Sequence, residues 1–233
     1  MSDVTFITGW SQGRQSFLPI LNKLTIPYTF ITPNSFLVDK NDNVSEKPSK
    51  YYYTIEKIIQ RKDKVVGWSM GGMIALELAI NNPKEVTELY LFSTTACFCS
   101  NPAITYGIPK LHLKKMIEGL SSDRDAIMSN FISAAYEGIE VNKEEIYHST
   151  TEFNNVSLIN GLNYLMNFNV LDKLHEIKAK TFIFHSTDDR IIDYQAALLL
   201  NERIPISELI TYKSPLHASQ FLAVDAILEK LNK

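Results

Sequence analysis

Cysteine is almost missing from this sequence, and the two that occur, Cys97 and Cys99, stand only two residues apart. At that spacing an extended segment does not bring two thiols together easily, so a disulfide framework is excluded. No apolar run reaches the length of a membrane-spanning helix, and the start, MSDVTFITGW, lacks the basic and long apolar regions of a signal peptide. We therefore expect a cytoplasmic protein that contacts no membrane.

An excess of basic charge is also missing, with 23 Lys and Arg against 26 Asp and Glu and a net charge of -3. Binding of nucleic acid needs clustered Lys and Arg, so the sequence does not favour that class of function. What is present is an ordinary globular composition, 45% hydrophobic over 233 residues. This length suffices for one domain, or for one domain that carries an inserted lobe.

Short runs of β-branched and aromatic residues alternate with longer stretches of helical period. The pattern predicts strands at 4–8, 28–32, 64–68, 87–92, 181–185 and 207–212. It predicts helices at 16–24, 51–60, 71–82, about 194–203 and about 218–231, and a polar loop over 34–50. Such alternation favours an α/β fold in which a mainly parallel sheet is covered by helices on both faces.

Between residues 94 and 177 the alternation stops, and this helical segment contains several helical patterns but no convincing strand. Apolar residues recur at helical spacing in LHLKKMIEGL, DAIMSNFISAAYEGI and LINGLNYLMNF. We predict a core of residues 1–93 and 178–233 and an inserted cap of residues 94–177, near the carboxyl ends of the strands where ligands bind in such sheets. The alternative is a helical insertion that only buries its own apolar faces and does not cover a ligand site.

One serine, Ser69, stands in the stretch GWSMGG between a predicted strand and a predicted helix. A G-x-S-x-G string in that setting predicts a strained turn that projects the serine hydroxyl above the sheet, with small neighbours to relieve crowding. The amide of Met70 then lies at a helix N-terminus and can donate to a developing oxyanion. A second donor is expected from the loop ITGWSQG, at the amide of Trp10; the alternative there is a simple turn with a packed indole.

A serine nucleophile needs a base, and the base needs a carboxylate that orients it. Of the five histidines only His217 is expected in a short loop between the last strand and the last helix. His112, His148 and His175 fall in the helical segment, and His185 falls within a strand, where we expect it to pack or to cap. Asp188 and Asp189 both follow the strand TFIFH, and the spacing alone leaves open which of them faces His217. His185 and these two acids lack a recognisable metal-ligand spacing.

With GWSMGG, HSTDDRIID and SPLHASQF in this order, the chain resembles the α/β-hydrolase superfamily over nearly its whole length. The resemblance implies an α/β-hydrolase fold with a helical cap and a serine hydrolase mechanism that uses no cofactor. It also implies Asp189 as the acid, because the family places the acid before a stretch such as DRII.

Within the superfamily the chain is similar to the pimeloyl-[acyl-carrier protein] methyl ester carboxylesterases, through TGW, GWSMGG, STTACF, INGLNYL and VLDKL. This likeness implies hydrolysis of a carboxylic ester, with acyl-carrier protein as a partner. However, residues 96–176 hold six Lys or Arg and ten Asp or Glu, a balance that argues against strong docking of that acidic partner. The usual His-Gly of the first loop is Thr8-Gly9 here.

The substrate is expected to be a small to medium, largely apolar ester that contacts Phe131, Trp68 and Ile191. The pocket is expected to draw on a minority of the large apolar residues of the helical segment: Phe98, Leu111, Met116, Met128, Phe131, Tyr136, Tyr164, Met166 and Phe168. The same machinery also serves thioesterases, carbon–carbon hydrolases and lyases. Two further alternatives are a ligand-binding receptor with little turnover and a scaffold without a small-molecule site.

Overall fold

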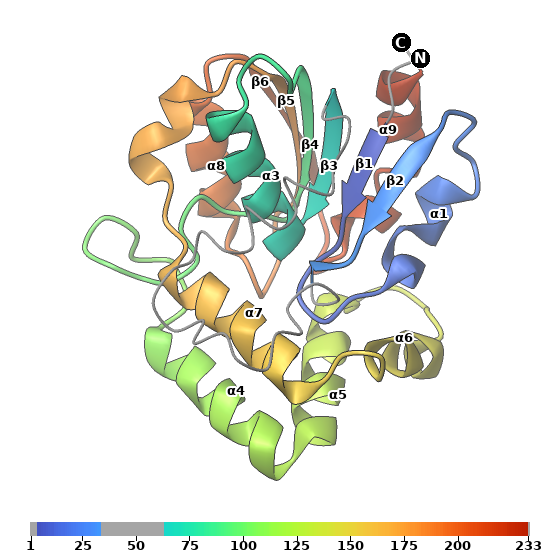
Figure 1. The fold of residues 1–233 in the computed structure, drawn as a ribbon, viewed down its shortest axis with the longest axis vertical. Coiled ribbons are helices and arrows are strands. Elements are labelled where there is room, and N and C mark those ends of the chain that lie inside the picture. Colours follow the sequence, from blue (N-terminus) through green and yellow to red (C-terminus); the bar gives the residue numbers. More distant parts are fainter. Residues whose placement is uncertain (1–3, 34–62, 233) are drawn as a thin grey trace.

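The computed structural model describes residues 4–33 and 63–232, and the strands within them form one six-stranded sheet (Figure 1). The strands are β1 (Val4–Ile7), β2 (Tyr28–Ile31), β3 (Lys64–Trp68), β4 (Glu88–Phe92), β5 (Lys180–Ser186) and β6 (Ser207–Tyr212). Their spatial order is β2-β1-β3-β4-β5-β6, and every neighbouring pair is parallel. The predicted α/β fold with a parallel sheet is confirmed.

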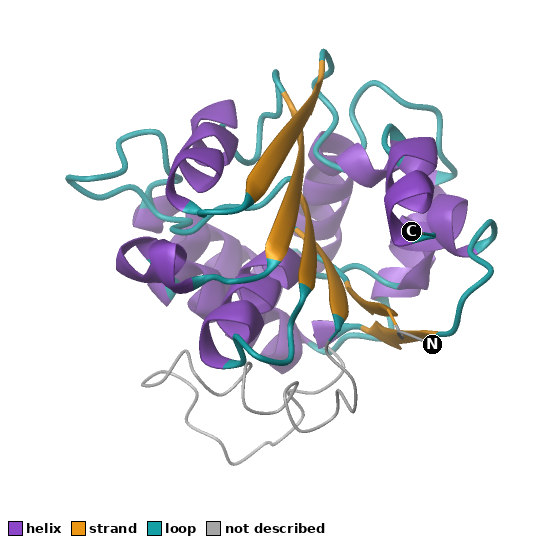
Figure 2. Ribbon diagram, turned by 90° about the horizontal axis from the view of Figure 1, so that it is seen from above, coloured by secondary structure: helices purple, strands orange, loops and turns teal. Residues whose placement is uncertain are grey.

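Helices cover both faces of this twisted sheet (Figure 2). One face carries α3 (Met70–Asn81) and α8 (Tyr194–Arg203), and the other carries η1 (Arg14–Phe17), α1 (Leu18–Leu21), η5 (Ser219–Phe221) and α9 (Val224–Leu231). Side chains alternate between the two faces along each strand: Ile183 of β5 packs in the core on the α3 side, whereas Phe182 and Phe184 pack on the α9 side. Phe184 stacks on Phe92 of β4 with ring centroids 4.6 Å apart, which joins the two strands across that face.

Two predicted helices are shorter than their sequence patterns. The one expected at 16–24 begins as a 3₁₀ turn and becomes α1 only at Leu18, because Pro19 has no N–H to donate to the preceding turn and is accommodated at the start of a helix. The one expected at 218–231 splits into η5 and α9, and only the α9 part is an α-helix. The expected loop 34–50 and helix 51–60 lie outside the described residues.

Most of the helical segment (residues 94–177) lies at the carboxyl ends of the strands, below the sheet in Figure 1, whereas residues 171–176 pack beside α3 and α8. It contains α4 (Lys110–Ser122), α5 (Arg124–Ala135), α6 (Lys143–Thr150), α7 (Asn155–Asn167) and η4 (Leu171–Glu176). Helix α6 was not predicted, because its sequence KEEIYHST buries only Ile146 and Thr150 and has no apolar stripe. Strand-like pairing within this segment is confined to isolated bridges such as Cys99 with Ile108.

Three side-chain hydrogen bonds tie the helical segment to the rest of the protein. The indole N–H of Trp10 donates to the carbonyl of Leu158 in α7 at 2.8 Å, and the hydroxyl of Tyr136 donates to Gln12 Oε1 at 2.9 Å. The hydroxyl of Tyr164 in α7 donates to Glu77 Oε2 in α3 at 2.7 Å. The first two bonds are buried and the third is partly buried, and together they hold α5 and α7 over the strand ends.

Glu77, which accepts the hydrogen bond from Tyr164, is a partly buried acid. Burial raises its pKa from an ordinary 4.5 to about 7, although the hydrogen bond from Tyr164 and the charge of Lys173 both act to lower it. The folded protein therefore keeps a proton, between pH 4.5 and about 7, that the unfolded chain has lost. The free energy of unfolding consequently falls as pH rises through this range.

Replacing Glu77 with glutamine is expected to stabilise the protein at pH 8 by up to about 3 kcal/mol, and to change little near pH 4. Glutamine cannot ionise, yet it still accepts the hydrogen bond from Tyr164. Thermal unfolding of both proteins at the two pH values measures the effect, with Glu202→Gln, an exposed site on α8, as the control. If Glu77→Gln were destabilised equally at both pH values, the raised pKa of Glu77 would be contradicted.

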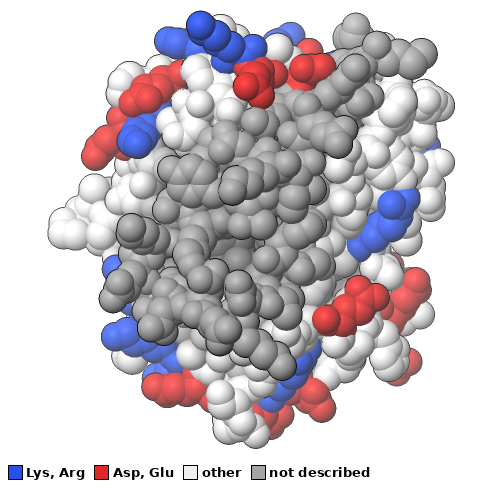
Figure 3. Space-filling model, viewed as in Figure 1, with Lys and Arg blue, Asp and Glu red and all other residues white. Residues whose placement is uncertain are grey.

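The surface carries charges of both signs. On the face shown in Figure 3, Lys and Arg side chains alternate with Asp and Glu around the edge and do not gather into one patch. In the described part of the chain, no helix is both long enough and apolar enough to cross a membrane.

Candidate active site

Ser69 occupies a strained turn between β3 and α3. Its φ of 54° and ψ of -117° lie in a region that non-glycine residues rarely adopt. The turn is held by the amide of Ser69, which donates to the carbonyl of Phe92 at 2.9 Å, and by its carbonyl, which accepts from the amides of Gly72 and Met73. The backbone thus fixes the direction of the serine side chain, which remains 6% exposed.

The glycines of GWSMGG are required by close packing of this turn. A Cβ on Gly67 would lie 2.5 Å from the carbonyl oxygen of Gly71, and a Cβ on Gly71 would lie 2.1 Å from the carbonyl oxygen of Ile7. A Cβ on Gly72 would lie 2.6 Å from Cβ of Thr94. Because backbone cannot yield as a flexible side chain can, the first two positions tolerate no side chain, and α3 can approach β1 and β3 closely.

Asp189 and His217 follow β5 and β6, and the structure brings them into contact. Nδ1 of His217 lies 2.8 Å from Oδ2 of Asp189, and both side chains are fully buried. The other carboxylate oxygen, Oδ1, accepts from the amides of Ile191 at 2.8 Å and Ile192 at 3.1 Å. Asp188 points elsewhere and forms an exposed ion pair with Lys213 at 3.0 Å.

The carboxyl of Asp189 is held in its ionised form. Burial alone would raise its pKa, but the charge and hydrogen bond of His217, the charge of His185 and the amide of Ile191 outweigh burial and bring the pKa below its ordinary value. An anion fixed against Nδ1 stabilises a proton on that nitrogen. The imidazole therefore presents Nε2 as a free acceptor.

Hydrogen bonds of its backbone hold the loop of His217 in place. Its carbonyl accepts from the indole N–H of Trp68 at 3.1 Å, and the amide of Ala218 donates to the carbonyl of Ala135 in α5 at 3.0 Å. Within the described chain, Nε2 of His217 is buried and has no hydrogen-bond partner, Ser69 included. An unpaired Nε2 fits a base whose hydrogen bond to the nucleophile tightens only when substrate is bound.

The backbone amides of Met70 and Trp10, both near Ser69, have no backbone acceptor among the described residues. Met70 is the first residue of α3, where amides have no partner inside the helix. Trp10 belongs to a tight turn in which Ser11 has a φ of 58°, and a Cβ on Gly9 would lie 3.3 Å from Cβ of Ser69. The absence of a side chain at Gly9 lets this turn lie directly against the serine.

A cavity of about 480 Å³ opens over Ser69, between the strand ends and the helical segment. Two predicted substrate contacts, Phe131 and Ile191, line it, as does the indole of Trp10, which packs edge-on against Phe131 with ring centroids 5.0 Å apart. Its other apolar lining residues are Phe98, Ile108, Leu113, Met116, Ile127, Ala134, Leu162 and Leu165. Such a lining suits an aliphatic chain.

The prediction that Trp68 contacts substrate does not fit its placement. Trp68 is fully buried, and it packs on the α9 side of the sheet together with Val66. Of the nine large apolar residues considered for the pocket, Phe98, Met116 and Phe131 line the cavity. Met128, Tyr164, Met166 and Phe168 pack in the core on the α3 side of the sheet and Tyr136 packs on the α9 side, whereas Leu111 is 62% exposed.

Four polar residues of the lining were missed from the sequence: His112, Lys115, Asn130 and Arg190. Helical spacing offered a signal, because His112 and Lys115 share a face of α4 with Met116. Arg190 forms an ion pair with Glu137 at 3.2 Å. No carboxylate occurs among the described residues that line the cavity, so its ionisable lining is basic.

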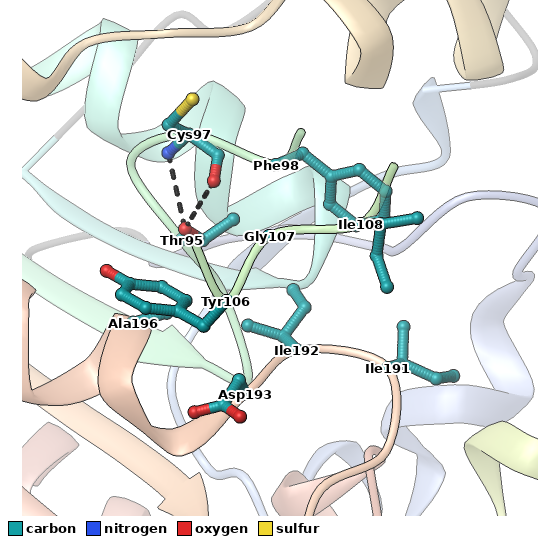
Figure 4. Close-up of a pocket in the computed structure, with 10 residues that line it drawn as sticks. All are labelled: Thr95, Cys97, Phe98, Tyr106, Gly107, Ile108, Ile191, Ile192, Asp193 and Ala196. Atoms are coloured by element: carbon teal, nitrogen blue, oxygen red, sulfur yellow. Dashed lines mark hydrogen bonds between the residues drawn. The ribbon is translucent and has the colours of Figure 1, made fainter. Parts of the chain in front are cut away.

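A second cavity adjoins the first and shares Phe98, Ile108 and Ile191 with it (Figure 4). Its volume is about 10 Å³, which admits one water molecule and no substrate. No cluster of three or more His, Cys, Asp or Glu suited to a metal ion occurs in residues 4–33 and 63–232.

Comparison with known proteins connects this arrangement to hydrolases. A pimeloyl-[acyl-carrier protein] methyl ester esterase of Nitrosospira multiformis is 26% identical over 151 residues, which cover 62% of this chain and 57% of that protein. One of Aromatoleum aromaticum is 23% identical and covers 93% of this chain and 91% of that protein. An esterase (EaEST) from Exiguobacterium antarcticum, 20% identical, has a similar fold, with a TM-score of 0.82 over 100% of this chain and 91% of that one.

Residues 54–221 match the family described as serine aminopeptidase, S33. The match covers more than half of the chain and includes Ser69, Asp189 and His217. The chain belongs to this family, within the α/β-hydrolase superfamily.

Proposed function

We propose that the protein hydrolyses carboxylic esters, with Ser69 as the nucleophile, His217 as the general base and Asp189 as the carboxylate that orients His217. The observation that carries the proposal is the position of Ser69, on a strained turn that opens into an apolar cavity. The Asp189–His217 pair at the same edge of the sheet supports it. The relatives from Nitrosospira multiformis and Aromatoleum aromaticum are named as esterases, which also supports it.

In the proposed reaction, Oγ of Ser69 attacks the ester carbonyl while Nε2 of His217 takes its proton. The amides of Met70 and Trp10 donate to the oxyanion that forms. His217 next gives the proton to the leaving alcohol, and the acyl group remains on Ser69. His217 then takes a proton from the water molecule that attacks the acyl-enzyme, and it returns this proton to Oγ of Ser69 as the carboxylic acid leaves.

The lining of the cavity favours an acyl chain of small to medium length. His112, Lys115 and Arg190 make an anionic group at the far end of the chain acceptable, because the described lining has no carboxylate to repel it. The methyl ester named for the relatives therefore belongs among the substrates to be tested. Docking of an acidic carrier protein has weaker support, since acidic residues outnumber basic ones in the helical segment.

Hydrolysis of p-nitrophenyl esters of graded acyl length is expected to be saturable, with an optimum at short to medium chains. The monomethyl ester of a linear dicarboxylic acid and its dimethyl ester test acceptance of the distal anion. A fluorophosphonate probe is expected to modify the peptide that contains Ser69, as read by mass spectrometry. Failure of both hydrolysis and labelling would overturn the proposal. Turnover of thioesters but not of esters would show that the substrate is a thioester.

A further inference from the structure

A second histidine, His185, lies beside the Asp189–His217 pair, and the proposed reaction does not use it. It is the sixth residue of β5 and is completely buried. Its Nε2 lies 2.9 Å from the carbonyl oxygen of Ile192 and 3.7 Å from Oδ2 of Asp189. The loop that follows β5 therefore folds back over the ring of the histidine that precedes it.

The partner of Nε2 fixes the tautomer of His185. A carbonyl oxygen only accepts, so Nε2 carries the hydrogen and donates to Ile192. Burial lowers the pKa of His185, although the charges of Asp189 and Asp193 and the bond to Ile192 act to raise it, and the charge of His217 adds to the lowering. At pH 7 the ring is consequently neutral, and Nδ1 carries no hydrogen.

Among residues 4–33 and 63–232, the buried Nδ1 of His185 has no hydrogen-bond partner. A buried acceptor in that state destabilises the fold, and an apolar ring of the same size would not bring this cost. Filling space in the core therefore does not explain why this residue is a histidine. What distinguishes it from an apolar ring is the N–H that it directs at Ile192 and Asp189.

The bond to Ile192 belongs to a chain of contacts that ends on the predicted base. Ile192 accepts from His185 through its carbonyl and donates through its amide to Oδ1 of Asp189 at 3.1 Å. The same carboxylate meets Nδ1 of His217 through its other oxygen, Oδ2. A shift of Ile192 would therefore rotate the carboxylate and lengthen its contact with His217.

We propose that His185 is a positioning residue, whose Nε2–H holds the turn from Asp189 to Ile192 and thereby aims Asp189 at His217. This inference rests on the proposed function for its kinetic consequences, but its geometric consequence is independent of turnover. His185 touches no reacting atom and acts only through Asp189.

Three variants test the proposal. His185→Phe keeps a buried ring and removes the donor, whereas His185→Gln keeps a donor on a longer, flexible side chain. Thr181→Val is the matched control, because Thr181 lies on β5 on the same face, is fully buried and donates to the carbonyl of Ala179 at 3.1 Å, away from Asp189. Titration with a fluorophosphonate counts folded active sites, so that loss of folded protein does not appear as loss of kcat.

We expect His185→Phe to lower kcat per titrated site by about 10- to 100-fold with little change in KM, and His185→Gln to recover most of the loss. The acid limb of the kcat/KM profile is expected to move to lower pH in His185→Phe, since a carboxylate aimed less well stabilises the imidazolium less. Thr181→Val is expected to unfold at a lower temperature but to keep kcat per site.

Proton NMR supplies a measurement that does not need turnover. The ring proton between His217 and Asp189 should resonate far downfield in the wild type and in Thr181→Val, and it should shift or broaden in His185→Phe. An unchanged resonance in His185→Phe, or an unchanged kcat per site with an unmoved acid limb, would overturn the positioning role. An inactive wild type would overturn the proposed esterase instead, and the resonance would still decide the role of His185.

Discussion

Replacing Ser69 with alanine is expected to lower kcat for ester hydrolysis by at least about 10⁴-fold, because alanine leaves nothing to form the acyl-enzyme. The proposed oxyanion donors and the cavity remain, so a small rate above that of water is expected to persist. Initial rates with the best ester of the chain-length series measure the effect. Circular dichroism and thermal unfolding show whether the variant folds.

Ser93 provides a matched control for this substitution. It follows β4 as Ser69 follows β3, it is fully buried, and its φ of 41° is also positive. Its hydroxyl donates to Oγ of Ser219 at 2.9 Å, so Ser93→Ala loses one hydrogen bond, worth about 1 kcal/mol, and is expected to keep its activity. Saturable hydrolysis that survives in Ser69→Ala would show that another group is the nucleophile.

Asp189→Asn is expected to lower kcat by about 10⁴-fold without loss of the fold. The amides of Ile191 and Ile192 both donate to Oδ1, so the side-chain oxygen of asparagine must take that place. Its NH₂ group then faces Nδ1 of His217, which has to become an acceptor. The proton moves to Nε2, and His217 can no longer take a proton from Ser69.

The neighbouring acid gives the control for this second variant. Asp188 forms an exposed ion pair with Lys213, and Asp188→Asn is expected to change kcat by less than about twofold. Measuring kcat for both variants at several pH values distinguishes loss of the general base from a change in the pH range in which it acts. Comparable losses in the two would contradict the assignment of Asp189 as the orienting carboxylate.

Much of the fold was predictable because strand period and turn chemistry are local properties. The six strands appear within a residue or two of their predicted bounds. GWSMGG marks a strained turn, because its glycines leave room where a side chain would clash with the backbone. The loops that carry Asp189 and His217 were predictable for the same reason, since each directly follows a strand. Spacing alone did not choose between Asp188 and Asp189.

The cavity was harder to predict because it forms between elements that are distant in sequence. Helical period shows which residues of α4 share a face, but whether that face meets the core or the cavity depends on α7, more than thirty residues further on. Trp68 is a different case, because alternation along β3 places it on the same side as Val66, opposite to Val65. That signal was available from the sequence.

The parallel order of the sheet has a consequence for biosynthesis. During translation β4 emerges long before its neighbour β5, because the whole helical segment lies between them in the chain. Until β5 has emerged, one edge of β4 is unpaired and Phe92 lacks the ring of Phe184 on which it stacks. The helices α4 to α7, whose backbone hydrogen bonds are local, can form earlier than this long-range pairing. A nascent chain paused in this interval exposes an apolar strand edge, and that is the stage at which a chaperone would protect it from aggregation.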